Sequence, residues 1–242
     1  GSFDIGIGID SYEGVNLVSG LREKNIMGDG RELNFSINTS ENNTKYILGL
    51  VEPYIFNQKA DFIYNISFTD NKFESSSYDV ASFINNIGFK YALTDEIKHL
   101  VVLEYKLKNY TITDSTKASN SVKKLSGSNA DILLSNSFIA NKLDSLMRPT
   151  KGTYLSFNNG ISPITNNDNG YLKNIIKYKK YYKFKTNILS FRTVLGNVYS
   201  LQNKEIPNDD KFALGGRSLR GFDSFGVGPR NSRTSYVGGN NI

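Results

Sequence analysis

Cysteine and tryptophan are absent from the 242 residues, and His99 is the only histidine. A chain without thiols forms no disulfides and has no cysteine nucleophile, which suits an oxidising compartment. One histidine without cysteine does not make a metal site, and a Ser-His-Asp triad would depend on His99 alone. We therefore expect no enzymatic activity, no metal and no other cofactor.

Two acidic pairs are the remaining candidates for acid–base chemistry, Asp114 with Asp131 and Asp209 with Asp210. Paired carboxylates share a proton only when the fold holds them close together. Both pairs lie in polar stretches of the chain. We interpret all four residues as solvated.

Long apolar runs are also missing, because no stretch of about 18 apolar residues occurs, and the mean hydropathy is −0.38. This excludes a transmembrane helix but not a transmembrane β-barrel, whose strands alternate apolar and polar residues. The N-terminus has neither the basic segment nor the apolar segment of a signal peptide. We expect the sequence to be an internal piece of a longer chain.

The formal net charge is +6, so anionic partners need to be considered. The basic residues are spread along the chain, apart from one cluster between Lys173 and Lys185. No nucleic-acid-binding motif accompanies this cluster. We expect no binding to nucleic acid.

Alternation of apolar and polar residues is present along most of the chain. In residues 3–10, Phe3, Ile5, Ile7 and Ile9 share one face, opposite Asp4, Gly6, Gly8 and Asp10. Such a period of two is typical of a β-strand with one apolar face. Similar stretches predict eleven strands: 3–10, 15–22, 33–38, 46–51, 62–68, 83–93, 101–108, 132–140, 155–161, 171–182 and 189–195. Residues 112–128 are expected to be a polar loop, and no helical period is found.

A soluble β-sandwich would show the same alternation as a membrane barrel. Aromatic residues near strand ends, as in the girdles of membrane barrels, favour the barrel: Phe3, Tyr12, Tyr54, Tyr91, Tyr110, Tyr154, Tyr182 and Tyr199. In a barrel, the residues facing lipid would include Ile5, Ile7, Leu33, Phe35, Leu103 and Phe138. Those facing the lumen would include Asp4, Asn34, Glu104 and Arg192.

A glycine-rich stretch near the C-terminus runs from Phe212 to Phe222 and continues to Arg230. Its glycines allow a sharply turned loop with positive φ at several positions. Arg220 stands between Leu219 and Gly221, and its guanidinium offers five donors in a fixed fork to acidic partners. The alternative interpretation is a glycine-rich hairpin with a solvated arginine.

The glycine-rich stretch resembles the signature loop of the outer-membrane β-barrel assembly and translocation family. The matching residues are Gly215, Gly216, Arg220, Gly221, Phe222, Gly228 and Pro229. Residues 143–152 resemble a second family feature, a periplasmic turn, through Asp144, Pro149, Thr150 and Gly152. Residues 235–240 resemble the start of the strand that follows the signature loop.

The resemblance implies an all-β fold, an antiparallel transmembrane β-barrel preceded by periplasmic domains. The family barrel has sixteen strands, so residues 1–242 would be one partial barrel domain with about eleven to twelve of them. Its signature loop would fold into the lumen, where Arg220 would bond to the inner wall through partners largely beyond residue 242. An incomplete sheet leaves polar edges that hydrocarbon does not tolerate, so we expect a gap in the barrel.

The function that the resemblance implies is insertion of β-barrel proteins into the outer membrane of a Gram-negative bacterium. The partners would be the lipid bilayer, unfolded client barrels and, through missing periplasmic domains, accessory lipoproteins. Clients would pair with the edge of the first strand, at Phe3, Ile5, Gly6, Ile7 and Gly8. Gly6 and Gly8 would weaken local pairing, or else relieve crowding on the inner face. The alternatives are a translocator of the two-partner secretion type and a passive porin-like barrel.

Overall fold

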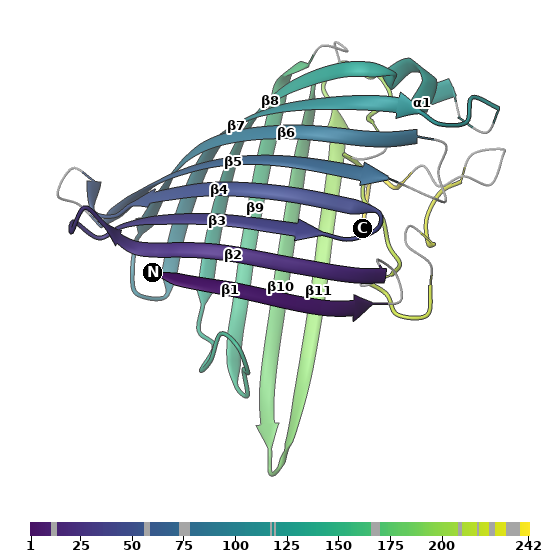
Figure 1. Cartoon of the computed structure of the whole chain (residues 1–242). Coiled ribbons are helices and arrows are strands. Elements are labelled where there is room, and N and C mark those ends of the chain that lie inside the picture. The colour runs from purple at the N-terminus through teal and green to yellow at the C-terminus, as the bar shows by residue number, and fades with distance from the viewer. Residues whose placement is uncertain are drawn as a thin grey trace.

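The computed structural model contains one antiparallel sheet of eleven strands, with neighbours in chain order from β1 to β11. It describes residues 1–10, 14–55, 59–72, 78–116, 118, 120–165, 170–207, 210–216, 218–222, 226–230 and 238–242. The strands are β1 (Ser2–Asp10), β2 (Gly14–Ile26), β3 (Arg31–Thr39), β4 (Asn43–Glu52), β5 (Ala60–Lys72), β6 (Tyr78–Ala92), β7 (Ile97–Ile112), β8 (Gly127–Asn141), β9 (Gly152–Thr165), β10 (Tyr171–Phe184) and β11 (Asn187–Ser200). The sheet curves into an open trough, with β1 to β5 on one side and β9 to β11 on the other (Figure 1).

Strand register sorts the side chains onto two faces as the alternation predicts. Phe3 lies opposite Leu21, and Leu21 lies opposite Phe35. Tracing the paired residues from strand to strand assigns each side chain to one of the two faces. One face carries Ile5, Ile7, Leu33, Phe35, Leu103 and Phe138, and the other carries Asp4, Asn34, Glu104 and Arg192. The polar set shares its face with Lys106, which contacts the C-terminal segment inside the trough. The apolar face is therefore the convex, outer one.

One row of the outer face departs from the apolar pattern. Asn136, Asn159, Asn174 and Asn197 follow one another directly across β8 to β11, and Asn241 bridges to Asn197. The Asn159 amide donates to Asn174 Oδ1 at 2.5 Å, and the Asn174 amide donates to Asn197 Oδ1 at 3.0 Å. These amide–amide bonds satisfy polar groups on a largely apolar surface, and the backbone bridge between Asn197 and Asn241 aligns the residues after the loop with β11.

The connection between β7 and β8 contains a short helix, α1 (Asn120–Leu125). The sequence predicts only a polar loop over residues 112–128, so the helix was missed. Six residues are too few to show a helical period, and so short a helix depends on its attachments. In the described part of the chain, no helix is long and apolar enough to cross a membrane.

The sheet is open, with β1 and β11 as its two outermost strands. The last residues continue it, because Gly196 and Ile242 exchange two backbone hydrogen bonds of 2.9 Å. The Val198 N–H also donates to the Asn240 carbonyl at 2.8 Å. The expected count of eleven strands and the beginning of a twelfth is thus confirmed, as is the gap in the barrel.

Candidate functional site

The turn between β8 and β9 is organised around Asp144. Its Oδ1 accepts hydrogen bonds from the backbone N–H groups of Thr150 at 2.9 Å and Lys151 at 3.2 Å, and its Oδ2 accepts one from the Thr150 hydroxyl at 2.5 Å. Gly152 has φ +110°, and a Cβ there would lie 2.0 Å from the Lys142 carbonyl oxygen. Of the four residues that the sequence singles out in this turn, Asp144 and Thr150 are joined by hydrogen bonds and Gly152 supplies the positive φ. The fourth, Pro149, is half-buried beside them.

The hydrogen bonds from the Thr150 hydroxyl and backbone lower the pKa of Asp144 to about 2. A carboxyl whose pKa is lower in the folded state stabilises the fold above its unfolded pKa of about 4. That contribution disappears as the pH falls through the folded value. In unfolding-temperature measurements from pH 6 to pH 2, the full-length protein should therefore exceed its Asp144→Asn variant above about pH 4 and approach it near pH 2. A gap that does not change with pH would contradict this role of the carboxylate.

Asp210 is the main contact between the C-terminal segment and the inner wall. Its side chain is 5% exposed, and Lys108 of β7, at 6%, is almost as buried. Lys108 Nζ lies 3.2 Å from both carboxylate oxygens, and Lys106 Nζ lies 3.7 Å from Oδ1. Two inward-facing lysines of one strand thus converge on a single carboxylate.

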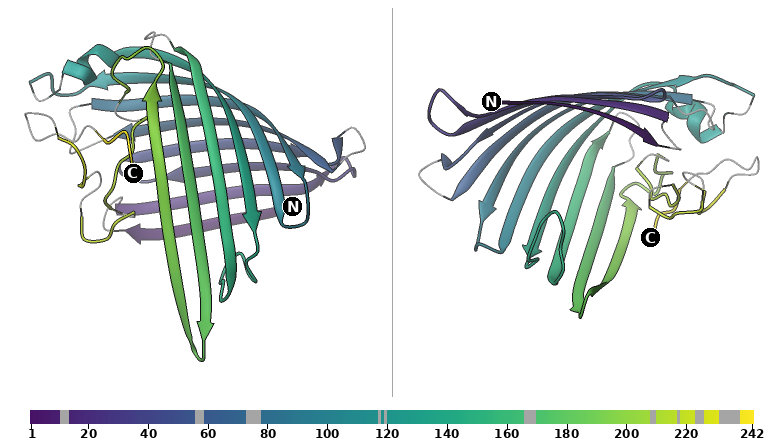
Figure 2. Two further views of the ribbon diagram at one scale, coloured as in Figure 1. Left: turned by 180° about the vertical axis from the view of Figure 1, so that it is seen from behind. Right: turned by 60° about the horizontal axis from the view of Figure 1, so that its bottom comes forward.

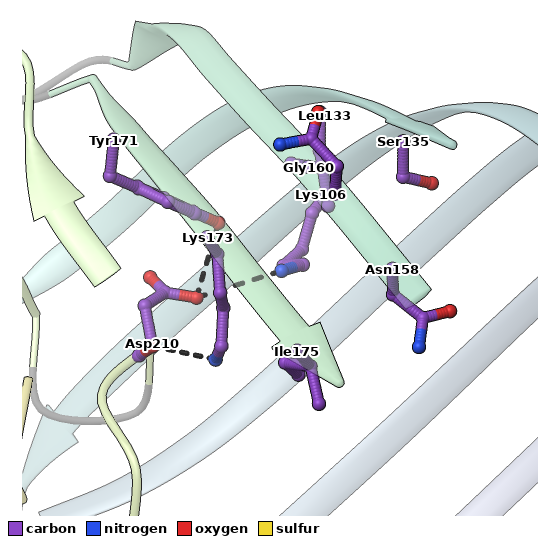
Figure 3. A pocket seen from close by; sticks show the side chains of 10 residues that line it. Lys106, Leu133, Ser135, Asn158, Gly160, Tyr171, Lys173, Ile175 and Asp210 are labelled. Atoms are coloured by element: carbon purple, nitrogen blue, oxygen red, sulfur yellow. Dashed lines mark hydrogen bonds and ion pairs between the residues drawn. The ribbon is translucent and has the colours of Figure 1, made fainter. Parts of the chain in front are cut away.

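Residues of β10 complete the surroundings of Asp210 (Figure 3). Lys173 Nζ donates to the Asp210 backbone carbonyl at 2.7 Å, and the Tyr171 hydroxyl donates to its Oδ1 at 3.4 Å. These residues border a cavity of about 180 Å³ whose lining also includes Leu133, Ser135 and Gly160. We call Asp210 with Lys106, Lys108, Lys173 and Tyr171 the Asp210 cluster. It joins the C-terminal segment to β7 and β10 at once.

Burial by itself raises the pKa of Asp210, but the neighbouring Lys108 and Lys106 lower it more, so the pKa lies below its usual value. Asp210 is therefore a charged, buried group with cationic partners. The prediction that Asp210 is a solvated loop residue is wrong. Asp209 lies outside the described residues.

Apolar contacts surround the Asp210 cluster. Tyr171, Val198 and Ile206 form a buried core on the inner wall, against which Leu133 and Phe212 pack. The Phe212 ring occupies the space above Gly196, where a Cβ would approach it to 2.6 Å. The chain before the signature loop is thus held on the concave side of the sheet by Ile206, Asp210 and Phe212.

The signature loop is closed by short backbone pairs. Phe212 and Gly239 exchange two hydrogen bonds of 2.8 Å, and Leu214 bridges to Val227. The Gly216 N–H donates to the Phe222 carbonyl at 2.8 Å. The expected positive φ angles occur at Gly215, Gly216, Gly221 and Gly228. The loop lies near the strand ends at one mouth of the trough (Figure 2).

Arg220 is exposed at this mouth. No hydrogen bond or ion pair joins its guanidinium to another residue in the described part of the chain. Its bond to the inner wall therefore stays a prediction, as do the roles of Pro229 and Phe222, which are also exposed. Arg217 and residues 235–237 lie outside the described residues.

Strand β1 is paired with β2 over its whole length, from Ser2 opposite Arg22 to Asp10 opposite Gly14. Its outward side chains are highly exposed, with Ile7 at 75%. A Cβ at Gly6 or Gly8 would meet nothing within 4 Å. The two glycines therefore do not relieve crowding on the inner face of this chain.

Comparison with known proteins identifies the family of this barrel. A family model described as the Omp85 superfamily domain matches residues 25–242. The chain belongs to the Omp85 superfamily. It is 25% identical over 245 residues to the outer membrane protein assembly factor BamA of Nitratidesulfovibrio vulgaris, covering 98% of this chain and 30% of that protein.

Relatives also occur in animals. The chain is 26% identical over 251 residues to the sorting and assembly machinery component 50 homolog of Bos taurus, covering 99% of this chain and 50% of that protein. In fold, it resembles the crystal structure of BamA from Haemophilus ducreyi lacking POTRA domains 1–3, with a TM-score of 0.86, 21% identity, and coverage of 99% of this chain and 51% of that one. This Omp85 chain thus spans about half the length, or less, of these relatives.

Sequence reasoning found the Omp85 signature loop but missed the Asp210 cluster that holds its base. A usable signal was present in β7, where Glu104, Lys106 and Lys108 alternate with apolar residues and so share the inner face. Two adjacent inward lysines require an anion nearby once they are buried. That requirement indicates a buried acidic residue, although the sequence does not say which one.

Proposed function

We propose that the full-length Omp85 protein containing this barrel inserts β-barrel proteins into a bacterial outer membrane. The strand proposed to receive the client is β1, which pairs regularly with β2 from Ser2 to Asp10. An edge strand presents unpaired N–H and C=O groups to which another strand can add. The observation that carries the proposal is the similarity of 98% of the chain to an outer membrane protein assembly factor of a bacterium, and similarity to the sorting and assembly machinery component 50 homolog of Bos taurus supports the same activity.

In the proposed mechanism, a client strand adds to β1 through main-chain hydrogen bonds, and Phe3, Ile5 and Ile7 present an apolar outer face to lipid. Gly6 and Gly8 leave the middle of the inner side of this strand without side chains, between Asp4 and Asp10. Burial of apolar client residues in the bilayer and backbone pairing would supply the free energy. Arg220 would hold the signature loop to the inner wall, and periplasmic domains would recruit accessory lipoproteins.

Reconstitution of the full-length protein into liposomes tests this proposal. An unfolded outer-membrane barrel added outside should become membrane-inserted and protease-resistant at least about tenfold faster than with empty liposomes. A two-partner translocator would instead deliver its partner to the far side, where the partner is shielded from protease without being inserted. A passive porin would release small solutes and leave client insertion at the background rate. Either of these results would overturn the insertase assignment.

A further inference from the structure

The inner wall carries a group of cations at the end opposite the signature loop. We define Lys177, Lys179 and Lys183 of β10 with Arg192 of β11 as the basic patch. Lys179 lies directly opposite Arg192 in the β10–β11 register, so two positive side chains occupy neighbouring positions on one face. Like charges in such a cross-strand pair destabilise a sheet. This arrangement is unfavourable unless an anion lies over it.

Three other cations on the inner wall have carboxylate partners: Arg22 with Glu32 at 2.6 Å, Lys90 with Asp61 at 2.6 Å, and Lys108 with Asp210 at 3.2 Å. No ion pair joins any member of the basic patch to a carboxylate within the described ranges. The basic patch thus differs from these three cations in having no carboxylate partner within the described ranges.

Asp95, Glu96 and Asp144 lie in the turns at this end of the barrel, and within the described ranges none of them forms an ion pair with the basic patch. Glu96 forms an ion pair of 2.8 Å with Lys142, and Asp144 accepts the hydrogen bonds of its own turn. The neighbouring inward cation, Lys98 of β7, shares a row of the sheet with Lys177 and adds to the positive charge. Within the described residues, the strands and turns at this end thus supply no carboxylate that pairs with the basic patch.

The basic patch is accessible. Pairing of β10 with β9 ends at Tyr181 opposite Gly152, whereas pairing with β11 continues to Phe184 opposite Asn187. The β10–β11 hairpin consequently reaches beyond its neighbours (Figures 1 and 2). Lys179 Nζ lies 5.3 Å from the centre of the Tyr154 ring, which holds this ammonium on the inner wall.

We propose that the basic patch binds an acidic segment of polypeptide that enters the barrel at this end. Its position on the concave face separates it from the side of the sheet that faces lipid. Lys177 and Lys179 lie two positions apart on one face of β10, a spacing of about 6.6 Å, and Lys183 lies four positions further along the same face, about 13 Å away. An extended peptide with acidic residues at alternate positions has the same spacing. This inference does not depend on whether the protein inserts clients.

A labelled synthetic peptide of six Glu-Ser repeats tests the proposal by fluorescence anisotropy with the full-length protein in detergent micelles. Replacing both Lys179 and Arg192 with Gln should weaken peptide binding about tenfold or more. The matched control is Lys180→Gln with Lys185→Gln, which removes two positive charges from the same hairpin outside the basic patch. The control should change the affinity by less than about threefold.

Thermal unfolding without peptide separates binding from a structural role. Lys179→Gln should leave the unfolding temperature unchanged or raise it, because it removes repulsion from Arg192; a fall would mean that Lys179 serves only to pack on Tyr154. Equal losses of peptide affinity in both double variants would overturn the proposal. So would equal binding of a Gln-Ser peptide, failure of the Glu-Ser peptide to bind, or stronger competition by anionic lipid vesicles than by unlabelled peptide.

Discussion

Replacing Asp210 with alanine is expected to detach the base of the signature loop from the inner wall. The substitution leaves Lys106, Lys108 and Lys173 clustered without their carboxylate, and breaking a buried ion pair in this way costs about 3–5 kcal/mol. The backbone N–H groups of Phe212 and Gly239, which exchange hydrogen bonds just beyond the Asp210 cluster, report on the attachment. Their hydrogen-exchange protection in the full-length protein should fall by a factor of about 10² to 10³.

Two variants make this test specific. Asp210→Asn keeps the shape but removes the charge, so it should lose nearly as much protection as Asp210→Ala. Glu205→Gln is the control, because Glu205 pairs with Lys211 at 3.6 Å while its own side chain is 60% exposed, and exposed pairs contribute about 0–1 kcal/mol. If Asp210→Asn behaved like the unmodified protein, the carboxylate would not be what holds the loop.

Proline substitutions in β1 are expected to have the second large effect, on client insertion. Successive residues of a strand direct their N–H groups to opposite sides, so of Ile7 and Gly8 one faces β2 and the other faces the open edge. Proline removes the N–H at its position. The variant whose replaced N–H group faces the open edge should therefore insert clients about tenfold more slowly, a loss equivalent to one hydrogen bond. Its stability should change little.

The other proline should mainly destabilise the β1–β2 pairing. Ile7→Val, which preserves the backbone and nearly the side-chain shape, should insert clients at the normal rate. The liposome insertion assay and thermal unfolding, run on the same three variants, separate the two effects. Normal insertion by both proline variants would show that the main chain of β1 does not receive clients.

The sheet was predictable from the sequence because its side-chain period of two is visible wherever one face is apolar. The alternation from Phe3 to Ile9, for example, determines both the strand and its outward face. The turn at Asp144 was found through its resemblance to a family feature, and the structure supplies the physical reason, since Asp144 and Thr150 satisfy local backbone groups and Gly152 adopts a positive φ. Both depend on neighbours close in the sequence or on a regular repeat.

The Asp210 cluster was not predictable in the same way, because Asp210 lies 102 residues from Lys108 and 37 from Lys173 in the chain. In the sequence, Asp210 follows a polar stretch and looks solvated; only the curvature of the sheet brings Lys108 and Lys173 to it. Helix α1 was missed for a different reason, since six residues in a polar loop carry no periodic pattern. Long-range charge pairing and short loop helices both require the folded chain.

Disulfide crosslinking from β1 to a stalled client tests the account most directly. The sequence has no native cysteine, so cysteine can be placed singly at Ile5 in β1, or at Phe83 in β6 and Phe138 in β8 as outward-facing controls. A disulfide forms only when the two Cβ atoms come within about 4.5 Å. The account predicts crosslinks between the Ile5 position and a cysteine in the client's C-terminal strand, with few from the controls. Crosslinks of equal yield from all three positions would contradict the assignment of β1 as the edge that receives clients.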